Sequence, residues 1–398
     1  MAIRAELRTV LLLAVCQALY QTGGVVIITA GGLVGHILAP DKALATLPIS
    51  MWMVGTMIVT IPASLMMGRF GRKAGFTLGA LMGAGAGALA LVGLIIGSFW
   101  LFVAAHLLQG AYQAFAQFYR FAAADAASVE FKSRAISYVL TGGVVAAILG
   151  PNLVALTRDL TVTAPFVASY AALVVLGLIA TAVVGLGISM KPTAQRAEEP
   201  ARPLSLIARQ PVFLVAILVG AIGYGVMNLA MTATPLAMAG HDHSISQTAF
   251  VIQWHVLGMF VPSFFTGAII ARLGAPRVML IGVALLVAHV AIALSGAEFL
   301  YFLSALTLLG VGWNFAYIGG STLLTEAYRP SERALVQGVN DFTIFSTVVC
   351  SSFASGALLH GLGWTGVNAV ALPFLAAAGL ALILFLFTRR EAQVVRGA

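Results

Sequence analysis

The sequence predicts an all-α membrane protein with twelve transmembrane helices, arranged as two six-helix bundles that are related by an internal repeat. Of its 398 residues, 61% are hydrophobic and only 9% are charged, and the mean hydropathy is +1.02. Soluble domains are nearer to about 45–50% apolar and about 25% charged. The apolar residues also gather in stretches of about 20, the length at which a helix spans a bilayer. This composition excludes a soluble enzyme, a disordered chain and a nucleic-acid-binding module.

Twelve apolar stretches follow one another along the chain. The first six are predicted at 10–36, 43–67, 75–96, 98–123, 135–157 and 163–189. The second six are predicted at 211–235, 247–271, 277–295, 298–325, 335–360 and 364–388. The run between them, KPTAQRAEEPARPLSLIARQ, holds three prolines and six charges and is typical of a polar linker. The predicted domains are therefore residues 1–190, a cytoplasmic linker at 191–210, and residues 211–398.

The basic residues predict the orientation of these helices. The formal net charge is +8, from 21 Lys and Arg against 13 Asp and Glu. In the twelve-span arrangement, 18 of the 21 basic residues fall on one side of the membrane. Because cytoplasmic loops carry an excess of Lys and Arg, both termini are expected in the cytoplasm. The positive charge therefore reflects topology, and no nucleic-acid partner is expected.

The two halves of the chain resemble each other. The segment SLMMGRFGRK at 64–73 matches GAIIARLGAP at 267–276, which begins 203 residues later. Internal duplication on this scale is a known feature of transporters. The six-plus-six spans, the central linker and the Gly-Arg-Phe-Gly-Arg-Lys loop at 68–73 resemble the major facilitator superfamily, which implies its fold. In place of the acid that this superfamily carries in the loop, the two copies have Gly68 and Ala271.

Four charged residues are candidates for coupling or gating. Asp341 and Arg120 lie inside predicted spans, where ionisable side chains are costly and usually face a partner or a cavity. We expect Asp341 to face the interior and to pair with Arg120. The resemblance implies that this acid helps to hold the two halves together on the cytoplasmic side. Its absence implies either a weaker contact between the halves or one in which Asp125 pairs with Arg69 or Arg72. The alternative is that the basic residues of this loop only anchor the topology.

Two motifs on neighbouring spans form a candidate metal site. Met227 and Met231 lie in one span, and His255 and Met259 lie in the next. A spacing of four residues places each pair on one helix face, and both pairs are expected roughly 12 Å deep. Thioether and imidazole groups suit Cu(I). Spacing alone favours plain packing, because methionine commonly fills gaps in apolar cores.

These motifs resemble those of the CcoA-like copper importers of bacterial inner membranes, a group that also contains members assigned to riboflavin uptake. The resemblance implies copper import into the cytoplasm for haem-copper oxidase assembly, with Met227, Met231, His255 and Met259 as ligands. The expected partners are a copper ion, the lipid bilayer, a periplasmic copper donor and a cytoplasmic acceptor. The chain is expected to be a monomer in the inner membrane. We expect no enzymatic activity, no catalytic residues and no cofactor, since copper would be the transported substrate.

Two alternatives remain open. The first is uptake of riboflavin or a similar flat organic solute, in which case aromatic side chains would line a stacking cavity. These side chains are Tyr20, Trp52, Tyr112, Phe115, Tyr119 and Trp313. The second is proton-coupled export of lipophilic compounds, with Asp341 as the proton carrier.

Overall fold

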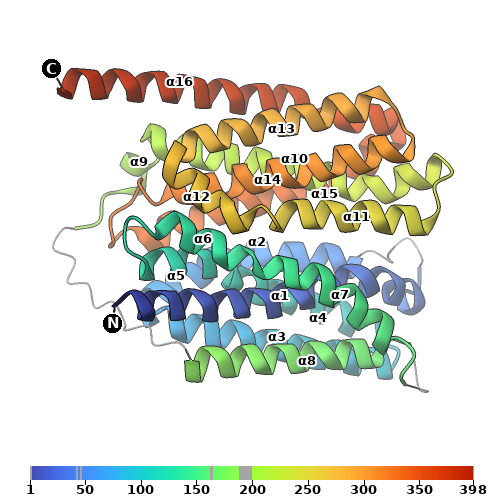
Figure 1. Ribbon diagram of the computed structural model, residues 1–398. Helices are drawn as coiled ribbons and strands as arrows, with labels where there is room; N and C mark the ends of the chain where they lie inside the picture. Colours follow the sequence, from blue (N-terminus) through green and yellow to red (C-terminus); the bar gives the residue numbers. More distant parts are fainter. Residues whose placement is uncertain (1, 42–43, 45–46, 162–164, 188–199, 398) are drawn as a thin grey trace. The chain divides into compact units, whose positions relative to one another are not determined.

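The computed structural model describes residues 2–41, 44, 47–161, 165–187 and 200–397, and the regular elements in these ranges are helices (Figure 1). The first half contains α1 Ala2–Leu38, α2 Leu47–Phe70, α3 Arg72–Ile95, α4 Phe99–Ala116, α5 Tyr119–Ala126, α6 Lys132–Leu140, α7 Gly142–Thr157 and α8 Val167–Ala182, which continues as a π-helical turn, Val183–Gly187. The second half contains α9 Leu204–Ile207, α10 Pro211–Gly240, α11 Ile245–Phe260, α12 Ser263–Leu273, α13 Ala275–Ser295, α14 Phe299–Leu324, α15 Arg333–Ala369 and α16 Ala371–Gly397.

Ten helical stretches in the described residues are long and apolar enough to cross a membrane. One of them, Arg333–Arg389, has 57 residues and would be roughly 85 Å long as a single straight helix, far more than one crossing needs. It contains the two spans predicted at 335–360 and 364–388, with Gly363 between them at a φ of 67°. The span predicted at 98–123 is divided between α4 and α5. The all-helical membrane fold is thereby confirmed, and residues 188–199, which include the first nine residues of the predicted linker, lie outside the described residues.

The chain divides into two compact units. The first comprises Met1–Ser128, Tyr138–Glu198 and Arg333–Phe345, and the second comprises Val129–Ser137, Glu199–Glu332 and Ser346–Ala398. This division departs from the predicted boundaries in two short segments. The segment 333–345 groups with the first unit, where the Ser64 hydroxyl donates to the carbonyl of Ala334 at 2.5 Å. The segment 129–137 groups with the second unit, where the Ser133 hydroxyl donates to the carbonyl of Gly267 at 3.0 Å.

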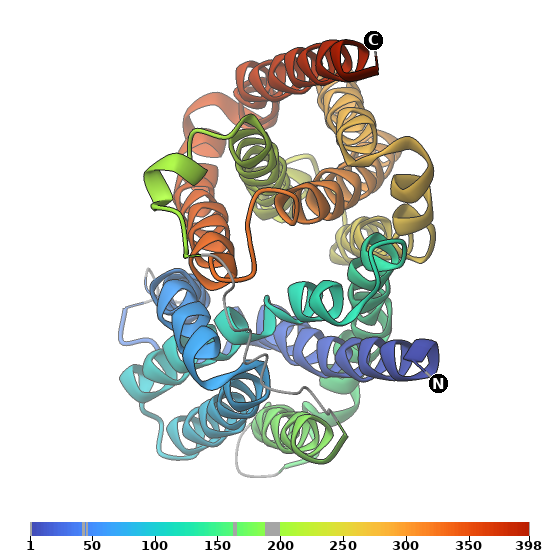
Figure 2. The same ribbon diagram turned by 90° about the vertical axis from the view of Figure 1, so that its left-hand side faces the viewer.

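The helices within each unit pack closely through glycine. In the first unit α4 packs along α2 and α3, and in the second unit α14 packs along α13, α11 and α10 (Figures 1 and 2). Helices α2 and α4 cross at Gly55 and Gly110, where an added Cβ would collide with the backbone of the other helix. Helices α11 and α14 cross at Gly258 and Gly310, and a Cβ on Gly258 would lie 2.7 Å from the carbonyl oxygen of Thr307. The same small-residue crossing therefore occurs once in each unit, as the internal repeat predicts.

Candidate functional site

The first unit contains a buried ion pair between two of the predicted gating residues. A guanidinium nitrogen of Arg120 lies 2.5 Å from a carboxylate oxygen of Asp341, and the two side chains are 1% and 0% exposed. The same carboxylate oxygen accepts a hydrogen bond from Asn340 at 2.7 Å. Arg120 also donates to the backbone carbonyl of Gln117 at 2.6 Å. Oδ1 of Asp341 thus accepts from both Arg120 and Asn340, whereas Oδ2 is buried and has no partner among the described residues. The pair is therefore only partly compensated for its removal from water.

The other two predicted gating residues meet at the edge of the same unit. Arg72 lies 3.0 Å from Asp125, and Arg333 lies 3.2 Å from the same carboxylate. Arg72 also donates to the side-chain carbonyl of Gln337 at 2.5 Å. Asp125 therefore provides a carboxylate near the loop in which the usual acid is replaced by Gly68. The structure brings Asp125 together with Arg72, one of the two partners considered, and the gating role of these residues stays a prediction.

The four candidate copper ligands lie on the helices that carry their motifs. Met227 on α10 and Met259 on α11 are buried, at 3% and 7% exposure, and Met231 is partly exposed. His255 is fully buried, and its Nδ1 donates to the carbonyl of Leu306 on α14 at 2.8 Å. The imidazole of His255 is therefore packed against α14, and the convergence of the four side chains stays a prediction.

A cluster of aromatic and polar side chains lies inside the first unit. Tyr20 on α1 meets Tyr112 on α4 edge to face, with ring centroids 5.4 Å apart. Tyr112, Tyr119 and Trp52 are at most 4% exposed. The Nε1 of Trp52, the Oε1 of Gln109 and the two tyrosine hydroxyls, which lie close to each other, form no well-shaped hydrogen bonds with the residues described. Unpaired buried polar atoms are rare in native proteins, and a bound polar ligand is one explanation.

A second aromatic cluster lies inside the second unit. Trp313 and Tyr317 stack on each other along α14, with centroids 4.8 Å apart and planes at 16°. Tyr224 on α10 meets both rings edge to face, at 5.3 Å and 5.4 Å, and Phe260 on α11 lies 5.8 Å from Trp313. The Nε1 of Trp313 is buried and has no hydrogen-bond partner among the described residues. Of these four side chains only Trp313 was expected from the sequence to line a cavity, although the spacing of four between Trp313 and Tyr317 predicts that they share a helix face.

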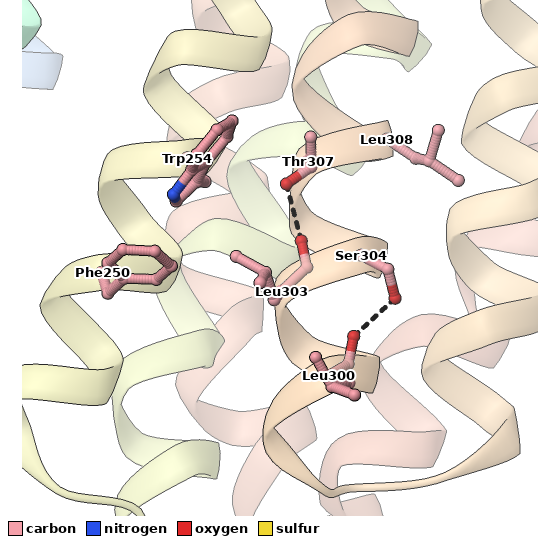
Figure 3. A pocket seen from close by; sticks show the side chains of 7 residues that line it. All are labelled: Phe250, Trp254, Leu300, Leu303, Ser304, Thr307 and Leu308. Atoms are coloured by element: carbon pink, nitrogen blue, oxygen red, sulfur yellow. Dashed lines mark hydrogen bonds between the residues drawn. The ribbon is translucent and has the colours of Figure 1, made fainter.

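An open groove of about 620 Å³ runs between α11 and α14 on the outside of the second unit (Figure 3). Its rings, Phe250 and Trp254, are 43% and 45% exposed. Its hydroxyls are satisfied within α14, because Ser304 donates to the carbonyl of Leu300 at 2.6 Å and Thr307 donates to the carbonyl of Leu303 at 2.7 Å. An apolar outer groove of this kind suits lipid tails rather than a polar solute.

Known proteins are similar to this chain over almost its whole length. The riboflavin transporter RfnT of Brucella anthropi is 43% identical over 382 residues, which cover 96% of this chain and 96% of the relative. The uncharacterized MFS-type transporter YddS of Bacillus subtilis is 29% identical over 359 residues, covering 84% of this chain and 80% of the relative. The crystal structure of the human organic anion transporter MFSD10 superposes with a TM-score of 0.79 at 14% identity. It covers 95% of this chain and 99% of the other.

These relatives correct the functional expectation. Copper import is wrong as the main assignment, because a relative with 43% identity over 96% of the chain is a riboflavin transporter. The physical reason for the error is that a spacing of four between methionines also arises in ordinary helix packing, where the flexible thioether fills gaps. The resemblance itself is confirmed in its broader form, since the group that it named also includes riboflavin transporters.

The family follows from the fold and the sequence together. The helical units repeat the same glycine crossing, and the solved neighbour shares the fold over 95% of the chain. The sequence model of the Major Facilitator Superfamily matches residues 13–253 and 218–397. These proteins are transporters, so the chain is a multi-pass membrane transporter and not an enzyme. It belongs to the Major Facilitator Superfamily.

Proposed function

We propose that this transporter takes up riboflavin or a solute of the same kind, a flat ring system with a polar edge. The observation that carries the proposal is the 43% identity to a riboflavin transporter, which extends over 96% of both chains. Identity at this level extends over both halves of the chain and is not confined to one shared motif.

The aromatic cluster of the first unit supports this proposal. The isoalloxazine ring of riboflavin has an apolar edge that stacks on aromatic side chains and a polar edge with carbonyl and N–H groups. Trp52, Tyr112 and Tyr119 provide buried rings, and the polar atom of each forms no well-shaped hydrogen bond with the described residues. Gln109 adds an unpaired side-chain carbonyl that can accept from a ligand N–H or hydroxyl.

The second unit also has groups that suit such a solute. Trp313 stacks on Tyr317, and its Nε1 donates no hydrogen bond to the described residues. The side chain of Asn228 on α10 donates to the hydroxyls of Ser351 and Ser352 on α15 at 2.9 Å and 2.7 Å. Polar side chains within membrane helices usually face a cavity or each other. Hydroxyl and amide groups of this type match the ribityl chain, which carries several hydroxyls.

The location of the transporter is part of the proposal. The basic residues cluster on one side of the predicted topology, which favours both termini in the cytoplasm. We assign the protein to the cytoplasmic membrane of a bacterium, with the solute moving inward, no cofactor, and the lipid bilayer as its partner.

The test is uptake of labelled riboflavin by riboflavin-requiring bacterial cells that lack their own transporter. Cells that produce the chain should accumulate the label, and unlabelled riboflavin should compete. Trp52→Leu should reduce the apparent affinity about fivefold or more, because the loss of a stacked ring costs roughly 1–3 kcal/mol. Trp313→Leu should have a similar effect. The matched control is Trp254→Leu, which removes an indole from the outer groove and should leave uptake unchanged.

The same cells allow a direct comparison with the corrected assignment. Copper accumulation should not differ between cells with and without the protein. Absence of riboflavin uptake from cells whose membranes contain the intact chain would contradict the proposal, as would equal uptake by all three tryptophan variants.

A further inference from the structure

Two buried polar side chains of the second unit play no part in the proposed solute site. They are His289 on α13 and Asn368 near the end of α15, and they are 0% and 1% exposed. His289 lies six residues before the end of α13 at Ser295, and Asn368 lies five residues after Gly363. Both therefore lie within about 7–9 Å of a helix end, and their side chains are neighbours.

The tautomer of His289 follows from its surroundings. Its Nδ1 lies 2.9 Å from the backbone carbonyl oxygen of Ala305 on α14. A carbonyl oxygen only accepts hydrogen bonds, so Nδ1 must carry the proton. In the neutral ring Nε2 is then left as a lone-pair acceptor, and it has no partner among the described residues.

The orientation of Asn368 is determined in the same way. Its side-chain nitrogen donates to the carbonyl of Trp364 at 2.8 Å, which rules out the flipped amide, because that would place two carbonyl oxygens together. Its Oδ1 is buried and also has no partner in the described part of the chain. Two acceptors therefore lie side by side without a hydrogen between them, a costly arrangement in a protein interior.

We propose that His289 is a proton-binding site, with Asn368 as the group that holds the bound proton. A proton added at Nε2 of His289 turns the two adjacent acceptors into a donor and an acceptor. The imidazolium then donates from both nitrogens, to the carbonyl of Ala305 and to Oδ1 of Asn368. The site is formed by three packed helices, so it is in place before the proton arrives.

The neighbouring titratable groups limit the site to a single proton. His255 on α11 is also fully buried, and its charge acts on His289. Two imidazolium groups near each other repel, so a proton on His289 disfavours a second proton on His255. Within the described side chains of the second unit, the other titratable or charged residues on α13 and on the helices around this site are Tyr224, Arg272, Arg277, Glu298, Tyr301, Tyr317, Cys350, His360 and Arg389.

A proton bound at His289 can be carried across the membrane down a proton gradient during the transport cycle. The binding of the proton does not depend on which solute is transported. Its use as the coupling ion rests on the proposed function, and the two parts are tested by separate measurements.

Proton binding is measured on the purified, folded protein in detergent without solute, by counting the protons taken up between about pH 8 and about pH 4. Asn368→Leu removes no titratable group, yet it should lower the count by about one proton per chain. The control is Asn152→Leu, which changes an exposed amide on α7 and should leave the count unchanged. Asn368→Asp should move proton uptake to a higher pH, because a carboxylate holds the imidazolium more tightly.

Equal proton counts for the wild type and Asn368→Leu would overturn the proposal, as would an Asn368→Asp titration that does not move upward. Coupling is then measured in vesicles with an acidic exterior. The wild type should accumulate riboflavin, whereas Asn368→Leu should exchange labelled for unlabelled riboflavin without accumulating it. Accumulation by Asn368→Leu at the wild-type level would overturn the coupling role. A chain that shows the proton difference but moves no riboflavin would contradict the proposed function and leave the proton site supported.

Discussion

Replacement of Asp341 by Asn is expected to destabilise the first unit strongly, because it leaves the charge of Arg120 buried without a counter-charge. The two side chains are 0% and 1% exposed, and they meet at 2.5 Å. Removing one partner of a buried ion pair costs about 3–5 kcal/mol. We expect the lower end of this range, about 3 kcal/mol. The reason is that Arg120 keeps its hydrogen bond to the Gln117 carbonyl and its position over the Phe121 ring, at 4.3 Å.

The double variant Arg120→Met with Asp341→Leu provides the decisive comparison. It removes both charges at once, and apolar replacements of a buried pair are often neutral or stabilising. The double variant should therefore be about as stable as the wild type and more stable than Asp341→Asn. The control is Arg158→Gln, which breaks a pair with Asp159 whose side chains are 57% and 79% exposed, and it should cost about 0.5 kcal/mol or less.

The assay is the free energy of unfolding of the purified transporter in a mixed detergent titration. The double variant and its two single variants, Arg120→Met and Asp341→Leu, form the double-mutant cycle. Additive losses in the double variant would show that the two charges do not interact. A loss for Asp341→Asn no larger than that for Arg158→Gln would show that Arg120 is not buried as described. Either result would refute the argument.

Two further predictions concern stability. The pKa of Glu332 is lowered from its usual 4.5 to about 2, first by the side-chain hydrogen bonds from Arg202. Its stabilising contribution should be complete above about pH 4.5 and lost as the pH falls toward about 2. The difference in Tm between the wild type and Glu332→Gln should therefore be constant near neutral pH and shrink on acidification, and a difference that does not change with pH would contradict this. Gly110→Ala should cost about 1–3 kcal/mol, because its Cβ would collide with the α2 backbone. Gly85→Ala, where a Cβ meets nothing within 4 Å, should be neutral or slightly stabilising in the same thermal assay.

Several features of the site were predictable from single residues, because the cost of burying charge restricts where ionisable groups can lie. Asp341 and Arg120 stand in apolar stretches, so each needed a partner within reach, and the structure brings the two together. Because Gly68 stands in place of the usual acid, Asp125 is the expected partner of a basic residue in this loop, and it lies 3.0 Å from Arg72. The copper assignment failed because it rested on a resemblance to a group that contains both copper importers and riboflavin transporters, and the spacing of the methionines cannot distinguish a ligand from a packing residue.

The membrane class and the internal repeat could be predicted from the sequence, since they follow from hydropathy, span length and similarity between the halves. Only the tertiary structure decided which polar atoms remain unpaired. Whether Trp52 or Trp313 finds a hydrogen-bond partner depends on helices distant in the sequence, and periodicity carries no information about that. The position of Asn368 beside His289 depends on the break in helical geometry at Gly363 and on a backbone carbonyl of α14, so it becomes visible only when the helices are packed.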